Sequence, residues 1–240
     1  MRIALLLCLV PALAWACPED APEEERPDDI VPLRSIAPSL PQDIRYAGSD
    51  NFLGTRVTGY DSPQCLLTRD AAHALMRAQG ALLRRGWQLK IYDCYRPQRA
   101  VQHFERWAAD PEESTRERYY PKLRKPQLLE QVYIAACSGH SRGSTVDVGI
   151  IPLDFREPRM TAPDCGAADA QAADMGTGFD CFDPRSHTDT DTIGTDQHLR
   201  RLILKQVMET AGFKNYEKEW WHYTLVNEPY PETYFDFPVR

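Results

Sequence analysis

The chain has 240 residues, 42% of them hydrophobic and 26% charged, which is the composition of one soluble globular domain with a sizeable core. Lys and Arg number 28 against 35 Asp and Glu, giving a formal net charge of −7, and this excludes the broadly basic surface that nucleic-acid binding requires. No apolar run reaches the roughly 18 residues of a membrane-spanning helix, so we expect neither a nucleic-acid partner nor a membrane span.

The N-terminus has the three parts of a secretory signal peptide. Residues 1–2 carry a positive charge, residues 3–10 are apolar, and Ala14-Trp15-Ala16 provides a small-residue cleavage site. A buried N-terminal helix is one alternative, but the acidic, proline-containing sequence that follows would interrupt it. Cleavage would make Cys17 the first mature residue, so acylation of a lipoprotein is a second alternative. We predict export through a signal peptide over residues 1–16.

Export would place the mature cysteines in an oxidising compartment, where up to three disulfides can form. The six are Cys17, Cys65, Cys94, Cys137, Cys165 and Cys181. Cys165 and Cys181 bracket a loop-like stretch and are the pair we expect. The sequence does not choose among the other pairings, and free buried thiols are the alternative. Because no C-x-x-C spacing occurs, we do not expect zinc bound by cysteines.

Residues 17–34 are rich in Pro, Glu and Asp, which predicts a flexible acidic leader before a folded domain over residues 35–240. Four segments carry apolar residues at helical spacing and are predicted helices: 69–85, 96–109, 127–136 and 197–211. Gly86 is placed to end the first of these helices, and Asp196 to cap the last.

Three segments are predicted strands from period-two alternation or β-branched residues: 87–92, 145–151 and 220–226. Residues 153–196 are rich in Asp, Pro, Gly and Thr and show little periodicity, so we predict a long loop there. Helices and short strands in mixed order indicate the α+β class. We expect a single domain with a small mixed or antiparallel sheet flanked by helices.

The most informative segment is Ser138–Asp147, in which His140 and Asp147 lie on either side of Gly143. Imidazole and carboxylate are both zinc ligands, and a glycine turn can bring two such groups to one point. Taken alone, the pattern also fits an ordinary hydrogen-bonded histidine.

A second segment, Glu219–Tyr223, places His222 three residues after Glu219 among aromatic residues. With His140 and Asp147, His222 would complete three protein ligands and leave one open position, as in catalytic zinc sites. Glu219 would then act as a general base toward water. Residues three apart point to opposite faces of a regular strand, so we expect Glu219 in a turn before the strand. The alternative makes the tryptophans core residues and His222 a structural histidine.

The third segment, Asp93–Arg99, lies where a predicted strand gives way to a helix. Peptide hydrolysis needs a fixed positive charge where the carbonyl oxygen becomes negative, and Arg96 could supply it. The alternative is an ordinary surface arginine, which is our interpretation of Arg99.

In this order, the motifs Y-R-P, S-x-H-x-x-G-x-x-x-D and E-x-W-H resemble the D-alanyl-D-alanine dipeptidases, a zinc peptidase family that also contains D,D-carboxypeptidases. The likeness runs from about residue 35 to the C-terminus and includes the segments 43–52, 175–180 and 228–238. It implies an α+β domain with one Zn²⁺ per chain at the sheet. The zinc ligands it implies are His140, Asp147 and His222.

The resemblance also implies roles for the other candidates. Glu219 would be the general base, and Arg96 would stabilise the oxyanion. Tyr46 and Asp180 match residues at the end of the site that receives the free ammonium of a dipeptide, and Ser138 matches a residue that contacts substrate. A carboxylate at Asp180 would favour a dipeptide over a longer peptidoglycan stem, which carries an amide at that point.

Some features depart from the family pattern. The loop 153–174 is longer and carries Cys165, and Cys94 stands where glycine is expected. Dipeptidases that destroy newly made precursor act in the cytoplasm, whereas an exported enzyme would salvage D-Ala-D-Ala outside the inner membrane. His187 is matched in the family but has no assigned role.

We therefore expect an exported, periplasmic zinc dipeptidase that hydrolyses D-Ala-D-Ala, with this small dipeptide as its binding partner and no prediction of oligomeric state. One rival is a zinc D,D-carboxypeptidase acting on peptidoglycan stem peptides. Others are a non-catalytic zinc-containing module that binds cell-wall peptides and a zinc-stabilised structural protein. Glu219 and Arg96 argue against the binding module, because binding alone requires neither, and the structural protein would bind no dipeptide.

Overall fold

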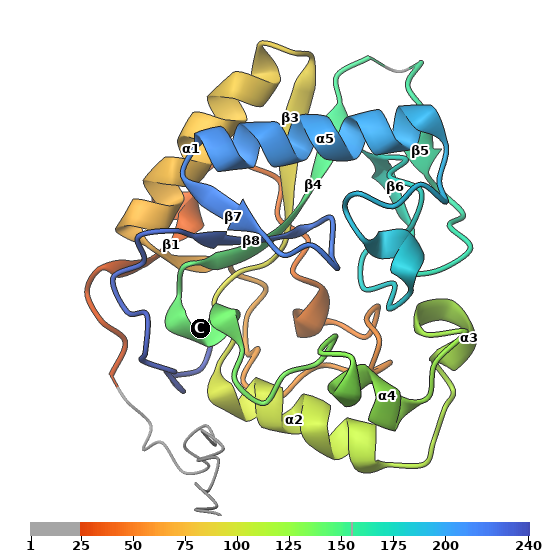
Figure 1. The fold of residues 1–240 in the computed structure, drawn as a ribbon. Helices are drawn as coiled ribbons and strands as arrows, with labels where there is room; N and C mark the ends of the chain where they lie inside the picture. Colours follow the sequence, from red (N-terminus) through yellow and green to blue (C-terminus); the bar gives the residue numbers. More distant parts are fainter. Residues whose placement is uncertain (1–24, 155) are drawn as a thin grey trace, which may run out of the picture.

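A computed structural model describes residues 25–154 and 156–240 as an α+β domain (Figure 1). The predicted signal peptide, residues 1–16, lies outside the described residues. The helices are α1 (Arg69–Leu83), α2 (Gln98–Ala109), α3 (Arg116–Tyr119), α4 (Lys125–Glu130) and α5 (Thr195–Thr210). The strands are β1 (Ile30–Pro32), β2 (Leu66–Thr68), β3 (Trp87–Asp93), β4 (Thr145–Pro152), β5 (Arg159–Met160), β6 (Asp169–Ala173), β7 (Phe213–Asn215) and β8 (His222–Leu225).

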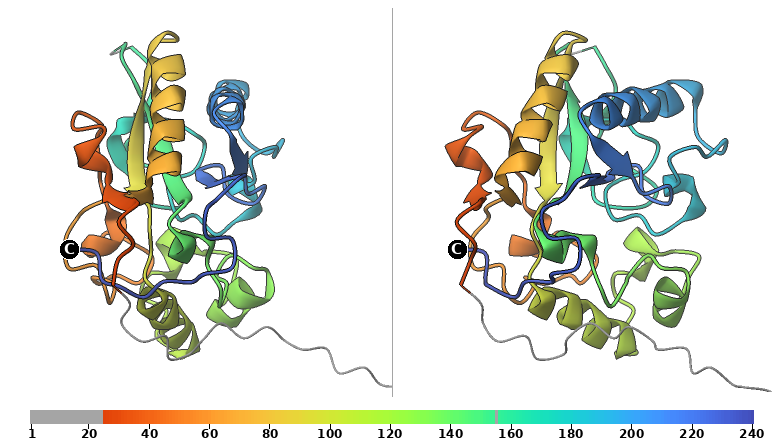
Figure 2. Two further views of the ribbon diagram at one scale, coloured as in Figure 1. Left: turned by 90° about the vertical axis from the view of Figure 1, so that its left-hand side faces the viewer. Right: turned by 60° about the vertical axis from the view of Figure 1, so that its left-hand side comes forward.

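The central element is a four-stranded antiparallel sheet with the order β3-β4-β8-β7. Helix α1 packs against β3 and α5 packs against β7, so the two helices cover one face of the sheet (Figures 1 and 2). Strand β6 contacts β4. The expected fold class and small antiparallel sheet are confirmed.

The sequence pattern explains why α1 forms where it does. The Thr68 hydroxyl accepts a hydrogen bond from the Ala71 amide (3.4 Å) and caps the first turn. One face of the helix is buried. Its apolar residues are Leu75, Leu82 and four alanines, Ala71, Ala72, Ala74 and Ala78. Gly86, with φ of +80°, reverses the chain into β3. The predicted helix and strand on either side of Gly86 are confirmed.

The boundaries of α4 and α5 differ from the predictions. Helix α4 ends at Glu130, and Val132, with φ of +60°, begins an irregular segment toward the site. Helix α5 begins at Thr195, since the Gln197 side chain accepts from the Gly194 amide (2.8 Å) and Asp196 already lies in the first turn. The predicted cap at Asp196 is therefore wrong.

Two segments predicted to be irregular contain regular structure. The chain of the predicted leader enters the fold before residue 35, because β1 pairs with β2 and buries Ile30. The predicted loop 153–196 contains β5 and β6, which form an antiparallel pair. Both pairs are too short for periodicity to reveal them.

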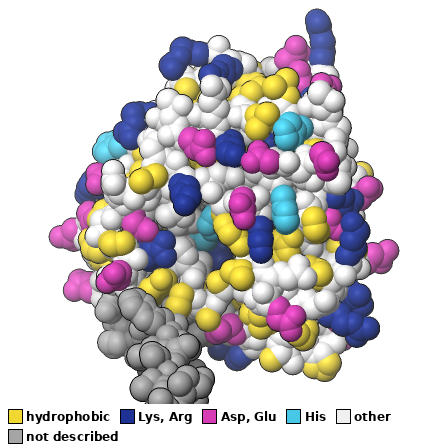
Figure 3. All heavy atoms as spheres, viewed as in Figure 1, with side chains coloured by type: hydrophobic (Ala, Val, Ile, Leu, Met, Phe, Trp, Pro, Cys, Tyr) yellow, Lys and Arg dark blue, Asp and Glu magenta, His cyan; other side chains and the backbone are white. Residues whose placement is uncertain are grey.

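Helices α2 and α4 contact each other on the side of the molecule away from α1 and α5 (Figure 1). Acidic and basic side chains are interspersed over the face shown in Figure 3. None of the helices formed by the described residues has the length and apolar character needed to cross a bilayer.

Candidate active site

The register of the sheet places two aspartates and one histidine, on three neighbouring strands, next to one another. Asp147 on β4 pairs directly with His222 on β8, and on its other side with Asp93 at the end of β3. Directly paired residues of antiparallel strands point to the same face of the sheet. Residues 54 or more positions apart in sequence are thereby brought to one point by backbone pairing.

His140 reaches this point from the 3₁₀ turn Gly139–Arg142, which leads into β4. Ser138 caps the turn through its side chain, and Gly143, with φ of +77°, ends it. A Cβ at Gly143 would lie 2.9 Å from the end of the Ile30 side chain, which would have to shift, but the left-handed conformation is the main reason for glycine here. The glycine turn predicted to bring His140 and Asp147 together is confirmed.

Three donor atoms meet at the centre of the site. His140 Nε2 and Asp147 Oδ1 are 3.3 Å apart, His222 Nδ1 and Asp147 Oδ1 3.1 Å, and the two ring nitrogens 3.3 Å. In tetrahedral zinc sites, bonds of about 2.0–2.1 Å place neighbouring donors about 3.3 Å apart. The separations therefore fit a metal ion of that size, and these residues form a potential metal-binding group.

The protonation of the donors fits the same conclusion. The His140 Nδ1–H donates to the Cys94 carbonyl (2.6 Å), because a carbonyl only accepts, and this leaves the Nε2 lone pair facing the centre. Burial lowers the pKa of His222 and favours its neutral form. Asp147 Oδ1 is buried without a hydrogen bond in the described part of the chain. Such an atom, lying between two imidazole nitrogens, is suited to a cation.

Glu219 lies beside this group. It stands in a turn closed by a hydrogen bond from the His222 amide to the Glu219 carbonyl (3.2 Å), just before β8, as predicted. The turn places Glu219 Oε2 3.5 Å from His222 Nδ1. Burial, and then the negative charge of Asp147, raises the pKa of Glu219 well above its usual range. A carboxyl group with a raised pKa can both accept and return a proton near neutral pH.

Arg96 approaches the group from the opposite side, and Asp93 holds it there. The guanidinium donates to Asp93 Oδ2 from Nε (3.0 Å) and lies 3.7 Å from Asp147 Oδ2. Asp93 is fully buried and also accepts from the Tyr60 hydroxyl (2.7 Å). The Arg96 side chain stacks on the Tyr46 ring at 5.0 Å. Arg96 is thus a fixed, partly desolvated charge and not a surface arginine.

Tyr46 and Asp180 form the far end of the site. The Tyr46 hydroxyl lies 3.1 Å from both oxygens of the Asp180 carboxylate and donates to it. Asp180 is 3% exposed. Burial, and then the charge of Asp147, raises the pKa of Asp180 well above its usual range. The carboxylate would therefore be stabilised by a cation bound beside it.

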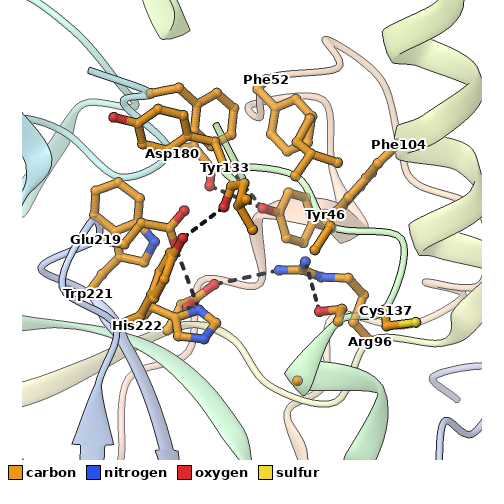
Figure 4. Close-up of a pocket in the computed structure, with 18 residues that line it drawn as sticks. Tyr46, Phe52, Arg96, Phe104, Tyr133, Cys137, Asp180, Glu219, Trp221 and His222 are labelled. Atoms are coloured by element: carbon orange, nitrogen blue, oxygen red, sulfur yellow. Dashed lines mark hydrogen bonds and ion pairs between the residues drawn. The ribbon is translucent and has the colours of Figure 1, made fainter. Parts of the chain in front are cut away.

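These groups line one cavity of about 200 Å³. In Figure 4, the side chains of Tyr46, Arg96, Asp180 and Glu219 point into it. Sites for drug-sized ligands usually measure about 300–1,000 Å³, so this cavity suits a smaller molecule. Aromatic side chains form much of the remaining wall: Phe52, Phe104, Tyr133, Phe182, Tyr216 and Trp221.

All eight predicted site residues line this cavity or lie at the donor group beside it. Ser138 accepts hydrogen bonds from the His140 amide (3.3 Å) and from Arg96 (3.5 Å). Two contributors were missed by sequence reasoning: Asp93, which orients Arg96, and Tyr133, whose hydroxyl lies 3.0 Å from His187 Nε2. Asp93 could have been found from its position at the end of β3, three residues before Arg96. No sequence signal marked Tyr133.

Two disulfides in which both cysteines belong to the described residues lie near the site. Cys165 pairs with Cys181, as predicted, and Cys65 pairs with Cys94. The second bond explains why cysteine stands at position 94, the residue whose own backbone carbonyl holds His140. Cys137, beside Ser138, is also disulfide-bonded.

Three convergent metal-type donors, a buried carboxyl group and a fixed arginine around a small cavity define a metal-dependent hydrolase of small substrates. Comparison with known sequences identifies its kind. Residues 26–240 match the profile of a peptidase family described as D-ala-D-ala dipeptidase. The chain belongs to this family and is a metallopeptidase.

Individual relatives agree with this assignment. A D-alanyl-D-alanine dipeptidase of Enterococcus faecalis is 41% identical over 82% of this chain and 91% of its own length. One from Streptomyces coelicolor is 40% identical over 88% of this chain and 98% of its own. One from Escherichia coli is 32% identical over 82% and 84%. The family resemblance inferred from the motifs is confirmed.

Proposed function

We propose that this enzyme hydrolyses the free dipeptide D-Ala-D-Ala to two D-alanines, with one zinc ion held by His140, Asp147 and His222. The observation that carries the proposal is the buried carboxylate of Asp180 at the end of a cavity of about 200 Å³. Relatives that cover most of the chain carry the name of this activity. A zinc ion in this position supplies Lewis-acid polarisation of a carbonyl and acidification of water.

Glu219 moves the proton in the proposed reaction. Its carboxylate takes a proton from the attacking water and later gives it to the leaving amine. The raised pKa of the buried carboxyl group suits this task, because it makes the carboxylate a stronger base than an exposed glutamate. Its distance of 3.5 Å from His222 Nδ1 places it against the donor group.

Arg96 stabilises the negative charge that develops on the carbonyl oxygen. Its guanidinium is already oriented by Asp93 and by the Tyr46 ring, so little reorganisation is needed during the reaction. Removal of one such donor typically costs about 10²–10³ in kcat.

Asp180 and Tyr46 select the substrate. In the described part of the chain, Tyr46 provides the only side-chain hydrogen bond to the Asp180 carboxylate, which retains capacity for an ammonium donor. A free dipeptide carries that ammonium, whereas a peptidoglycan stem carries a neutral amide. Pairing with the ammonium would offset the burial of Asp180, and an amide would leave the charge unpaired.

Alanine release from D-Ala-D-Ala and from N-acetyl-D-Ala-D-Ala, with and without a chelator, tests this proposal. We expect cleavage of the free dipeptide alone, loss of activity on chelation and recovery with zinc. Cleavage of both compounds would instead indicate a D,D-carboxypeptidase. Cleavage of neither by folded, zinc-loaded protein would indicate a binding module.

We further propose that the protein is exported to the periplasm, where it salvages D-Ala-D-Ala or contributes to cell-wall turnover. The two disulfides support this location, because such bonds persist in oxidising compartments and are rare in the cytosol. Cell fractionation with mass spectrometry of the mature N-terminus tests it. An unprocessed N-terminus in the cytosolic fraction would contradict it, and a lipid mass on Cys17 would indicate anchoring.

A further inference from the structure

Asp180 is held in an unusual backbone conformation. Its φ is +61°, in the left-handed region, which is uncommon for residues other than glycine. The side chain does little to fix this conformation, because Tyr46 provides its only side-chain hydrogen bond in the described part of the chain. The position of the carboxylate must therefore be set by the backbone on either side of Asp180.

That backbone is restrained on both sides by one neighbouring segment. Before Asp180, the Ala167 amide donates to the Phe179 carbonyl (2.7 Å) in an isolated antiparallel bridge. After Asp180, Cys181 is bonded covalently to Cys165, in the segment that also contains Ala167. Asp180 thus lies between a hydrogen-bonded bridge and a disulfide.

The two segments touch backbone to backbone. The Gly178 amide donates to the Cys165 carbonyl (2.8 Å). A Cβ added at Gly166 would lie 2.5 Å from the Gly178 carbonyl, so glycine is required for the close approach. Such a contact fixes register but buries little side-chain surface. The disulfide is therefore the strongest restraint between the segments.

We propose that the Cys165–Cys181 disulfide is a specificity-determining positioning element, which holds Asp180 in the conformation that recognises a free ammonium. This inference rests on the proposed function of Asp180. The bond acts through Asp180 and touches no reacting atom. It also gives a role to Cys165, the cysteine carried by the long loop, because Cys165 is the partner to which Cys181 is bonded.

The test measures discrimination between two compounds in Cys165→Ala/Cys181→Ala. The preference is measured as the ratio of the inhibition constant of N-acetyl-D-Ala-D-Ala to the KM for D-Ala-D-Ala. An inhibition constant can be measured even if the acetylated compound is not cleaved. We expect this preference for the free ammonium to fall about tenfold, equivalent to ~1.4 kcal/mol. Zinc content and kcat should change much less.

Two comparisons separate positioning from general stabilisation. Cys65→Ala/Cys94→Ala removes a different disulfide, beside His140, and should lower kcat while the preference stays unchanged. In an Asp180→Asn background, removal of Cys165–Cys181 should have no further effect on the preference. Equal losses of preference in both disulfide variants, or an additive loss in the Asp180→Asn background, would overturn the proposal.

The proposal can also be tested if the double cysteine variant does not fold. If the double variant does not fold, wild-type enzyme is reduced in a timed series, and alkylation with mass spectrometry reports which disulfide is open. The preference should fall with the fraction of Cys165–Cys181 opened, and no correlation would refute the inference. A wild-type enzyme that shows no preference for the free dipeptide would refute the proposed function itself, a result distinct from an unchanged preference in the variants.

Discussion

The two ends of the site are held by different kinds of structure. Asp147 and His222 lie on paired strands of the central sheet, and His140 lies on a turn that leads directly into one of them. Asp180 lies on an irregular segment with a left-handed backbone, joined to its neighbour by a short bridge and a disulfide. Regular hydrogen-bonded pairing positions the donors, whereas a covalent bond positions the selecting carboxylate.

The difference has a consequence for how each end tolerates change. A sheet distributes its restraint over many hydrogen bonds, so a side chain replaced on it leaves the backbone in place. The Asp180 end has no continuous strand pairing, and one of its restraints is a single covalent bond, so loss of that bond can move the carboxylate. Substitutions at the sheet end should therefore abolish chemistry with the fold intact, and substitutions at the other end should change selectivity first.

The largest effect is expected for His222→Ala. This substitution removes one of the three donors, and the remaining two cannot hold zinc in the arrangement of a catalytic site. We expect both zinc stoichiometry and activity to fall to near background, with the circular dichroism spectrum retained. His73→Ala, on the exposed face of α1, is the matched control and should change neither. Unchanged zinc content in His222→Ala would remove His222 from the donor set.

The next effect is expected for Glu219→Gln. The amide keeps the size of the side chain but cannot accept a proton, so kcat should fall by about 10²–10⁴-fold, the usual contribution of a general base. Zinc stoichiometry, measured by metal analysis, should stay at one. Glu217→Gln changes an exposed residue in the preceding turn, which the Glu219 amide closes by donating to the Tyr216 carbonyl (3.0 Å), and should be nearly neutral. Full activity of Glu219→Gln would exclude the role proposed for this residue.

The sequence predicted the three metal-type donors better than the residues that orient the side chains around them. His140, Asp147 and His222 stand in motifs with distinctive spacing, and the pairing of β4 with β8 follows from two recognisable strands. Asp93 was missed as a functional residue because its role arises only when its carboxylate meets Arg96 in space. The local signal was its position three residues before Arg96, and that position alone does not specify the contact.

The other region was predicted less well, also for a physical reason. Strands β5 and β6 are short, and the bridge between Ala167 and Phe179 depends on backbone contact, which leaves no hydrophobic periodicity. The disulfide between Cys165 and Cys181 was predicted, because the two cysteines bracket a loop-like stretch. The pairing of Cys65 with Cys94 could not be deduced, since it joins segments that only the fold brings together.

A smaller loss is expected for Arg96→Lys, which tests whether charge alone suffices at the sheet end. Lysine keeps the charge but loses the fork through which Nε and a terminal nitrogen both contact Asp93. We expect kcat to fall about 10²-fold with little change in KM, measured by steady-state kinetics. Arg99→Lys, whose side chain binds Asp236 outside the cavity, is the control for general effects of the exchange. A wild-type kcat would show that orientation by Asp93 is unimportant.

The smallest effect is expected for Asp169→Asn, in β6 close to the cross-linked segments. Asp169 is buried, lies 2.6 Å from Lys90 Nζ and accepts from the Tyr92 hydroxyl (3.0 Å). Burial tends to raise its pKa, but Lys90 and the hydrogen bonds outweigh burial and hold the pKa below the usual value. The charged form therefore stabilises the fold above the unfolded-state pKa of about 3.9, by about 1–3 kcal/mol.

This stabilisation should be lost as the pH falls below about 4 toward the folded-state pKa, because in that range the unfolded state binds a proton that the native state does not, and protonation therefore favours unfolding. Denaturant unfolding of wild type and Asp169→Asn between pH 7 and pH 3 should thus give a difference that is largest at pH 7 and shrinks below pH 4. The preference for the free dipeptide at pH 7 should be unchanged, because the disulfide and not this ion pair holds Asp180. A variant with wild-type stability but altered preference would reverse that assignment and make the Asp169 cluster the element that positions the selecting carboxylate.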